Sequence, residues 1–129
     1  MEMFKNTCKA AWNKDRLTWN IGDALVAETD GSLKQLREVH AECVEAGSEI
    51  KLKELRILYR TSKAFPPNKR VRKTSWIRHS ICDNRNEVIF VNKAFAHLET
   101  IEEYRVWWPP RKKFKFVKEM LKNWREDPY

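Results

Sequence analysis

The chain of 129 residues carries 26 Lys and Arg against 18 Asp and Glu, and 42% of its residues are apolar. A chain of this size buries one hydrophobic core, so we expect a single compact domain over residues 1–129. The mean hydropathy of −0.72 and the absence of a long apolar run exclude a membrane-spanning sequence. We therefore expect a soluble protein that has no membrane partner.

The cysteines and the first residues bear on the cellular compartment. Cys8, Cys43 and Cys82 are widely spaced and form no Cys-x-x-Cys pair, which is typical of reduced thiols. Residues 1–5 contain no apolar core of a secretory signal. These features predict a cytoplasmic location.

The positive charge is concentrated in one part of the sequence. Residues 51–80 contain ten basic residues and one acidic residue, whereas residues 1–50 carry a net charge of −3 and residues 81–129 one of +2. Charge of one sign at this density attracts polyanions such as nucleic acids. The alternative is a solvated basic face that only keeps the protein in solution.

Helix-forming residues dominate and only three glycines occur, so we predict an all-α fold. The first helix is expected over residues 2–13 and the second over residues 16–28. The apolar residues expected to face inward in the second helix are Trp19, Ile21 and Leu25.

A third helix is predicted to begin after Ser32, which with Gln35 matches a capping box. Gly47 is expected to end it, because glycine readily adopts the left-handed conformation at the C-terminal end of a helix. The apolar residues of this helix are Leu33, Leu36, Val39 and Cys43.

The helix predicted over residues 52–65 has two contrasting faces. At 100° per residue one arc is apolar, with Leu52, Leu55, Leu58, Tyr59 and Phe65. The adjacent stripe is basic, with Lys53, Arg56, Arg60 and Lys63. We expect the first face to pack and the second to carry positive charge into solvent. Two prolines end the helix.

A basic loop and a short helix are expected over residues 66–83. Thr74 or Ser75 is predicted to cap the short helix. Its remaining notable side chains are Trp76, Ile77, His79 and Cys82.

The C-terminal helices are expected over residues 85–126. Val88, Val91, Phe95 and Leu98 fit a helix, although residues 88–91 alone also fit a strand. Thr100 and Glu103 predict a second capping box, and the prolines at 109 and 110 are expected to end that segment. The last helix, over residues 112–125, should pack Phe114, Val117, Leu121 and Trp124. It also shows a second basic stripe, which consists of Lys115, Lys118, Lys122 and Arg125.

Two helices joined by a turn that contains glycine, the second with a basic exposed face, predict a helix-turn-helix over residues 32–65. In this motif the second helix enters the DNA major groove and reads base edges. The predicted DNA-binding residues are Lys51, Lys53, Arg56, Arg60 and Lys63 in the helix, and Lys69, Arg70, Arg72, Lys73 and Arg78 beyond it. We expect the helix to read bases and the loop to bind phosphates.

The stretch over residues 33–82 also carries a family resemblance. Its scaffold consists of Leu33, Leu36, Gly47, Leu52, Leu55, Arg56, Tyr59, Ala64, Phe65, Pro66, Ser75, Trp76 and His79. With these residues the chain resembles helix-turn-helix regulators of actinobacteria and of their phages and plasmids, and distantly the ParB and KorB partition proteins. The resemblance implies a transcriptional regulator or accessory DNA factor of a bacterial or phage-infected cell, with Lys53, Arg56 and Arg60 facing DNA. The turn over residues 46–51 is longer than usual, and no ParB-type nucleotide-binding region is present.

Catalytic and metal-binding patterns are weaker. His40 and Glu42 match the first half of a zinc deaminase signature, but its Pro-Cys-x-x-Cys partner is missing, so we expect no enzymatic activity. His40 with Cys43 and His79 with Cys82 make two His-x-x-Cys pairs. We interpret them as buried thiols and ordinary imidazoles, and expect no metal and no cofactor.

The aromatic residues near the C-terminus give a second functional hypothesis. Trp107 and Trp108 lie close to Phe114, Phe116 and Trp124, among lysines. Such residues are most often core, but exposed ones stack unpaired bases or bind a partner protein. The leading prediction is therefore sequence-specific binding of double-stranded DNA, with a homodimer as a further expectation. The alternatives are binding of RNA or a single strand, and a small phage effector that inhibits a host protein through the Trp107–Trp108 region.

Overall fold

The computed structural model describes residues 15–126, so the helix expected over residues 2–13 lies outside the described part. Residues 15–126 form helices and contain no strand, which confirms the all-α prediction. The helices are α2 (Asp15–Glu28), α3 (Leu33–Glu45), α4 (Leu52–Ala64), α5 (Trp76–Ser80), α6 (Arg85–Glu99) and α7 (Pro110–Glu126), with a 3₁₀ turn η1 (Pro67–Lys69) and a π-helical turn η2 (Glu103–Trp107). None of these described helices is long and apolar enough to cross a bilayer.

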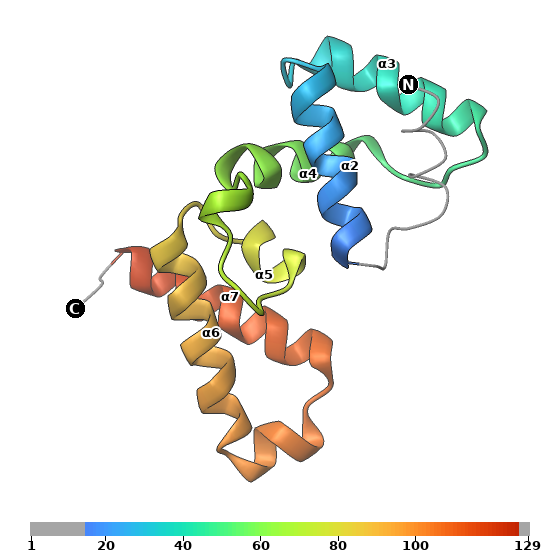
Figure 1. The fold of residues 1–129 in the computed structure, drawn as a ribbon. Coiled ribbons are helices and arrows are strands. Elements are labelled where there is room, and N and C mark those ends of the chain that lie inside the picture. The colour runs from blue at the N-terminus through green and yellow to red at the C-terminus, as the bar shows by residue number, and fades with distance from the viewer. Residues whose placement is uncertain (1–14, 127–129) are drawn as a thin grey trace.

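Helices α2, α3 and α4 pack together in the upper part of Figure 1, and α4 contacts both of the others. The predicted inward faces of these helices are largely buried, although Leu52 and Tyr59 of α4 are only partly buried and Leu33 is 42% exposed at the first position of α3. The buried apolar residues shared among them are Trp19, Ile21, Leu25, Leu36, Val39, Cys43, Leu55 and Leu58. Helical periodicity therefore predicted the core of this half correctly.

Helices α2 and α4 approach each other closely at Gly22. A Cβ atom on Gly22 would lie 2.8 Å from the carbonyl oxygen of Leu58 and would also collide with Ser62 Oγ. Gly22 is buried within α2, where glycine is unfavourable for the helix by itself. Its small size lets the two backbones meet, and this packing explains its presence there.

The ends of α3 are close to those predicted. The Ser32 hydroxyl accepts a hydrogen bond from Gln35 N–H at 3.3 Å. The Gln35 side chain accepts the N–H of Asp30 at 2.8 Å, whereas the Ser32 N–H donates to Asp30 Oδ1 at 2.8 Å, so only half of the predicted capping box forms. At the other end Gly47 has φ +86°, and Ser48 N–H bonds to Cys43 O at 2.9 Å, which ends the helix in a left-handed cap as predicted.

Helix α5 lies between the two halves of the described chain (Figure 1) and contacts α2, α4 and α6. Its first N–H group, that of Trp76, donates to the carboxylate of Asp15 at the start of α2. Ser75 occupies the N-cap position as expected, but its hydroxyl forms no cap hydrogen bond in the described structure. His79 is fully buried on α5, with the rings of Trp19 and Phe65 edge-on at 5.1 and 5.0 Å.

Helices α6 and α7 form an antiparallel pair in the lower part of Figure 1, joined through η2. Residues 88–91 belong to α6, so the helical alternative is confirmed. The capping box expected at Thr100 is wrong, because Thr100 is the C-cap of α6 and its hydroxyl donates to His97 O at 2.6 Å. Pro110 begins α7, since proline fits the first position of a helix where no N–H partner is needed.

Candidate nucleic-acid interface

The exposed face of α4 consists of basic side chains. Lys53, Arg56, Arg60 and Lys63 are all exposed. Leu55, Leu58, Thr61 and Ser62 are buried on the opposite side against α2 and α3. The predicted separation of an apolar face and a cationic face on this helix is therefore confirmed. Such a helix presents several positive charges to one ligand surface.

Most of these cations remain available to pair with a negatively charged ligand. Within residues 15–126, Lys53, Arg56 and Lys63 form no ion pair with a carboxylate. Lys51 is exposed at the N-cap of α4, where its N–H donates to Glu54 Oε1 at 3.1 Å. Glu54, the one acid of the basic window, is thus engaged in capping the helix. An exposed helix with unpaired cations attracts a polyanion in proportion to its charge.

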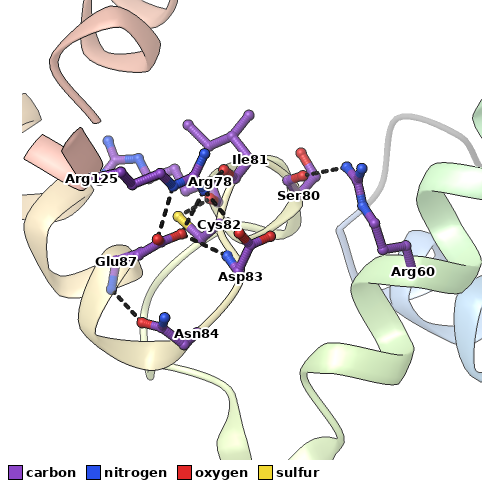
Figure 2. Close-up of polar contacts among 9 residues, drawn as sticks. All are labelled: Arg60, Arg78, Ser80, Ile81, Cys82, Asp83, Asn84, Glu87 and Arg125. Carbon is purple, nitrogen blue, oxygen red and sulfur yellow. Dashed lines mark hydrogen bonds and ion pairs between the residues drawn. The ribbon is translucent and has the colours of Figure 1, made fainter. Parts of the chain in front are cut away.

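Arg60 has a second contact inside the protein. Its Nη2 donates to the carbonyl oxygen of Ser80 at 3.2 Å, and Figure 2 shows its side chain extending from α4 toward the end of α5. This carbonyl lies at the C-terminal end of α5, where a cation is favourable. Arg60 therefore connects α4 to α5 while its side chain stays exposed, so it is less free than Arg56 to follow a ligand.

The loop after α4 presents three further cations. Lys69, Arg72 and Lys73 are exposed, as predicted, in the segment that includes η1. The loop is anchored to α5, because the N–H of Val71 donates to His79 Nε2 at 3.0 Å. Lys73 adopts a left-handed backbone with φ +57°, which is uncommon for a residue other than glycine. The loop cations therefore extend from an anchored backbone.

Arg70 differs from the free loop cation that we expected. Its side chain is only 20% exposed, and its Nη2 pairs with Asp23 Oδ1 at 2.6 Å. Its Nε donates to Phe65 O at 3.0 Å, and the guanidinium lies 3.8 Å from the centre of the Trp19 ring. Arg70 therefore holds the loop on α2 and α4, because its hydrogen bonds and its cation–π contact are made within the protein.

Arg78 is also engaged within the protein. Its Nη1 donates to Asn92 Oδ1 at 2.9 Å, and its guanidinium lies 4.2 Å from the centre of the Phe95 ring. Partial burial lowers the pKa of Arg78, with an opposing influence of Glu99. The side chain joins α5 to α6. Of the ten predicted residues, the structure thus places Lys51, Lys53, Arg56, Arg60, Lys63, Lys69, Arg72 and Lys73 on the surface and turns Arg70 and Arg78 toward other elements.

The histidine and cysteine residues have internal partners. His79 donates from Nδ1 to Ser75 O at 2.8 Å and accepts the Val71 N–H at Nε2, so both ring nitrogens are used. Burial raises the pKa of the Cys82 thiol to about 12, and nearby Glu87 acts in the same direction. A metal ligand must be a thiolate, which this environment opposes. His40 bonds to the carbonyl oxygen of Ile50 at 3.1 Å and so holds the turn before α4.

The residues of the second basic stripe differ in whether they are exposed or paired within the protein. Lys115, Lys118 and Lys122 are exposed on α7, but Arg125 is paired. Its Nε donates to Glu87 Oε2 at 2.8 Å and its Nη2 to Ile81 O at 2.9 Å, and Figure 2 shows this guanidinium between α6 and the end of α5. Arg125 therefore fixes α7 to the rest of the fold, which its helical spacing did not indicate.

A groove that the sequence did not predict separates α4 from α7. It has a volume of about 430 Å³, and its walls include Arg60 of α4 and Lys118 of α7. Apolar groups of Ile57, Trp76, Ile77, Ile81 and Phe114 line it as well. The groove forms because α7 packs near α4 and α5, from which it is distant in the sequence.

The aromatic residues near the C-terminus are partly core and partly surface. Val117 and Leu121 are buried, and Trp124 stacks on Phe90 at 4.8 Å. Trp108 lies among Tyr104, Phe116 and Lys112, with ring centroids 4.3 and 5.4 Å from the first two. By contrast, Trp107 is 77% exposed and Val106 is 56% exposed on η2. The tryptophan pair is thus split between a packed and an exposed side chain.

Comparison with known proteins identifies no relative. No protein-family model, curated protein or solved structure matches the chain.

Proposed function

We propose that the protein binds double-stranded DNA in a sequence-specific manner, as a transcriptional regulator or accessory DNA factor of the helix-turn-helix type. The observation that carries the proposal is the exposed cationic face of α4, with Lys53, Arg56 and Lys63 unpaired within residues 15–126. The DNA major groove is about 12 Å wide and accepts one helix with its side chains. Here α4 acts as the reading helix, α3 supports it, and α2 packs behind it.

The loop cations have a different role in this proposal. Lys69, Arg72 and Lys73 follow α4 and are exposed, so they bind the phosphates that flank the reading helix. Arg70 and Arg78 keep the loop and α5 in place through the contacts described above. In this proposal the loop positions the protein on the phosphates, and α4 reads the bases.

A titration of duplex DNA tests the proposal. The variant Lys53→Gln/Arg56→Gln/Lys63→Gln removes three cations from α4, and Arg16→Gln/Lys93→Gln/Arg105→Gln removes three exposed cations from α2, α6 and η2. We expect the native protein to lose affinity steeply between about 50 and about 200 mM salt, because phosphate contacts release counterions. The α4 variant should bind weakly and the control variant should bind normally. Duplex affinity that is absent at low salt, or equal in the two variants, refutes the proposal.

Trp107 supports a second candidate function, which is binding of a host protein by a small phage effector. A tryptophan that is 77% exposed beside a half-exposed valine is unusual on a surface and frequent at interfaces. The test is a pull-down from host lysate with the native chain and with Trp107→Ala, followed by direct titration of the captured protein. Light scattering on both chains distinguishes a host partner from self-association as a homodimer. Loss of one defined, saturable interaction in Trp107→Ala supports this function, and equal binding by both chains excludes it.

A further inference from the structure

Helix α7 exposes a row of cations that the proposed reading helix does not use. Arg111, Lys115, Lys118 and Lys122 follow one another at intervals of four, three and four residues, which places them on one face of the helix. The buried residues Val117 and Leu121 lie on a different face. Two acids of α7 border this row, Glu119 beside it and Glu126 one turn after Lys122. None of its three lysines forms an ion pair with a carboxylate of the described chain.

The cationic rows of α4 and α7 border the same groove. Arg60 lines it from α4 and Lys118 from α7, and Ile77 of α5 and Phe114 of α7 line it as well. Two acids also line the groove, but both have partners within the protein. Glu54 Oε1 accepts the Lys51 N–H, and Asp83 lies 3.6 Å from Arg125. The groove therefore carries charges of both signs, and the cations that project from its two walls are Arg60 and Lys118.

The two rows are held at a fixed separation by α5. Arg60 donates to Ser80 O from α4, and Arg125 donates to Ile81 O from α7, so the end of α5 is bound from both sides (Figure 2). The pairing of Arg125 with Glu87 adds a further connection to α6. Because these contacts are made by groups of the protein itself, they place α7 relative to α4 independently of a ligand and reduce the ordering required on binding.

We propose that the lysine row of α7 is a second phosphate-binding surface, which contacts the sugar-phosphate backbone of the duplex whose bases α4 reads. The inference rests on the proposed function. Lysine ammonium groups act as point charges, which suits phosphates better than base edges. Phosphate contacts make up about half or more of the hydrogen bonds at protein–DNA interfaces, so a reading helix ordinarily has such a neighbour. The apolar wall around Ile77 would face the sugars.

The test compares three variants of the full chain that each lose three positive charges. They are Lys115→Gln/Lys118→Gln/Lys122→Gln on α7, the α4 variant and the control variant on α2, α6 and η2. We expect the α7 variant to bind any duplex about tenfold more weakly or worse near 0.1 M salt. The plot of log affinity against log salt should also become shallower by about two to three units, at about 0.9 per lost phosphate contact. Thermal unfolding should be the same as in the native chain, because these lysines are exposed.

The DNA sequence preference of the α7 variant distinguishes the role of the α7 row from that of the α4 row. Phosphates carry no base identity, so this variant should keep the native ratio of affinities for a selected site and a scrambled one. An α7 variant that binds like the control, while the α4 variant fails to bind, overturns this inference and leaves the proposed function intact. A changed affinity ratio in the α7 variant also overturns it, because α7 would then contact bases. If the α4 variant binds like the control, the proposed function itself is wrong.

Discussion

His79 Nε2 accepts the backbone N–H of Val71 at 3.0 Å, which fixes the tautomer of a fully buried imidazole beneath the basic loop. The acceptor nitrogen must be unprotonated for this bond to exist. Nδ1 carries the proton and donates to Ser75 O at 2.8 Å. The loop that carries Lys69, Arg72 and Lys73 is therefore bound to α5 by a neutral histidine.

This arrangement predicts that stability falls in mild acid. Burial lowers the pKa of His79 below its ordinary value of 6.5, against smaller opposing influences of Ser75 and Asp15. At pH values between the folded and the unfolded pKa of His79, the unfolded chain binds more protons than the folded chain. The contribution of His79 to the free energy of unfolding is therefore fully present above about pH 7 and decreases as the pH falls below 6.5. The loss approaches about 1.4 kcal/mol per pH unit for one such group.

Denaturant unfolding from pH 8 to pH 5 measures this dependence. His79→Gln should remove it, whereas His97→Gln on the exposed surface of α6 should keep it. A pH dependence that is the same in both variants would assign the effect to another group.

Arg125 is predicted to stabilise the fold through Glu87. The Glu87 carboxylate is buried and accepts two hydrogen bonds from this guanidinium, which hold the pKa of Glu87 below its ordinary value. Arg125→Ala leaves that carboxylate without its main partner and should reduce the free energy of unfolding by about 2 kcal/mol at neutral pH, less than for a fully buried pair because Arg125 is partly exposed. The loss should shrink as the pH falls into the acidic range, because protonation of Glu87 removes the charge that the Arg125 guanidinium stabilises. Lys122→Ala, also on α7, is the matched control and should change stability little.

Gly22 is predicted to reject a side chain. In an open helix, glycine to alanine stabilises by up to about 1 kcal/mol. Here the new Cβ would meet Ser62 Oγ and the Leu58 carbonyl oxygen, and backbone atoms do not move aside easily. Gly22→Ala should therefore reduce stability by about 1 to 3 kcal/mol. Thermal melting measures the change. A raised melting temperature would show that α2 and α4 can move apart to accommodate the new Cβ without loss of stability.

Reading and positioning should be separable by two single substitutions. Arg56 lies one turn into α4 with an exposed guanidinium, so Arg56→Ala should reduce the preference for a selected site over a scrambled one by about 1 to 3 kcal/mol. Lys73→Ala in the loop should weaken binding to both sites equally and make the salt dependence shallower by about one unit. Paired titrations with thermal melts measure both effects. An equal loss of both affinities in Arg56→Ala would mean that α4 does not read bases.

Helices α2 to α7 and the cationic face of α4 follow largely from the sequence alone. The spacing of Leu55 and Leu58 against Lys53 and Arg56 is a local pattern, and a helix turns it into two faces wherever the helix lies. The end of α3 at Gly47 was predictable for the same reason, since a cap depends on a few neighbouring residues. Local chemistry was misleading at Thr100, where one hydroxyl fits the start of a helix as well as its end, and it predicted cap hydrogen bonds of Gln35 and Ser75 that the described residues do not form.

Whether each cation is paired within the protein or exposed to a ligand, by contrast, was decided by the tertiary structure. Arg70 and Arg56 have the same side chain in the same basic window, yet Arg70 pairs with Asp23 and Arg56 stays exposed. Asp23 is 47 residues away in the sequence, and no local pattern shows that α2 brings it there. The groove between Arg60 and Lys118 depends on the same long-range packing. The sequence determined which faces are basic, and the contacts between helices determined which of those charges a ligand can reach, because ion pairing requires two groups to meet in space.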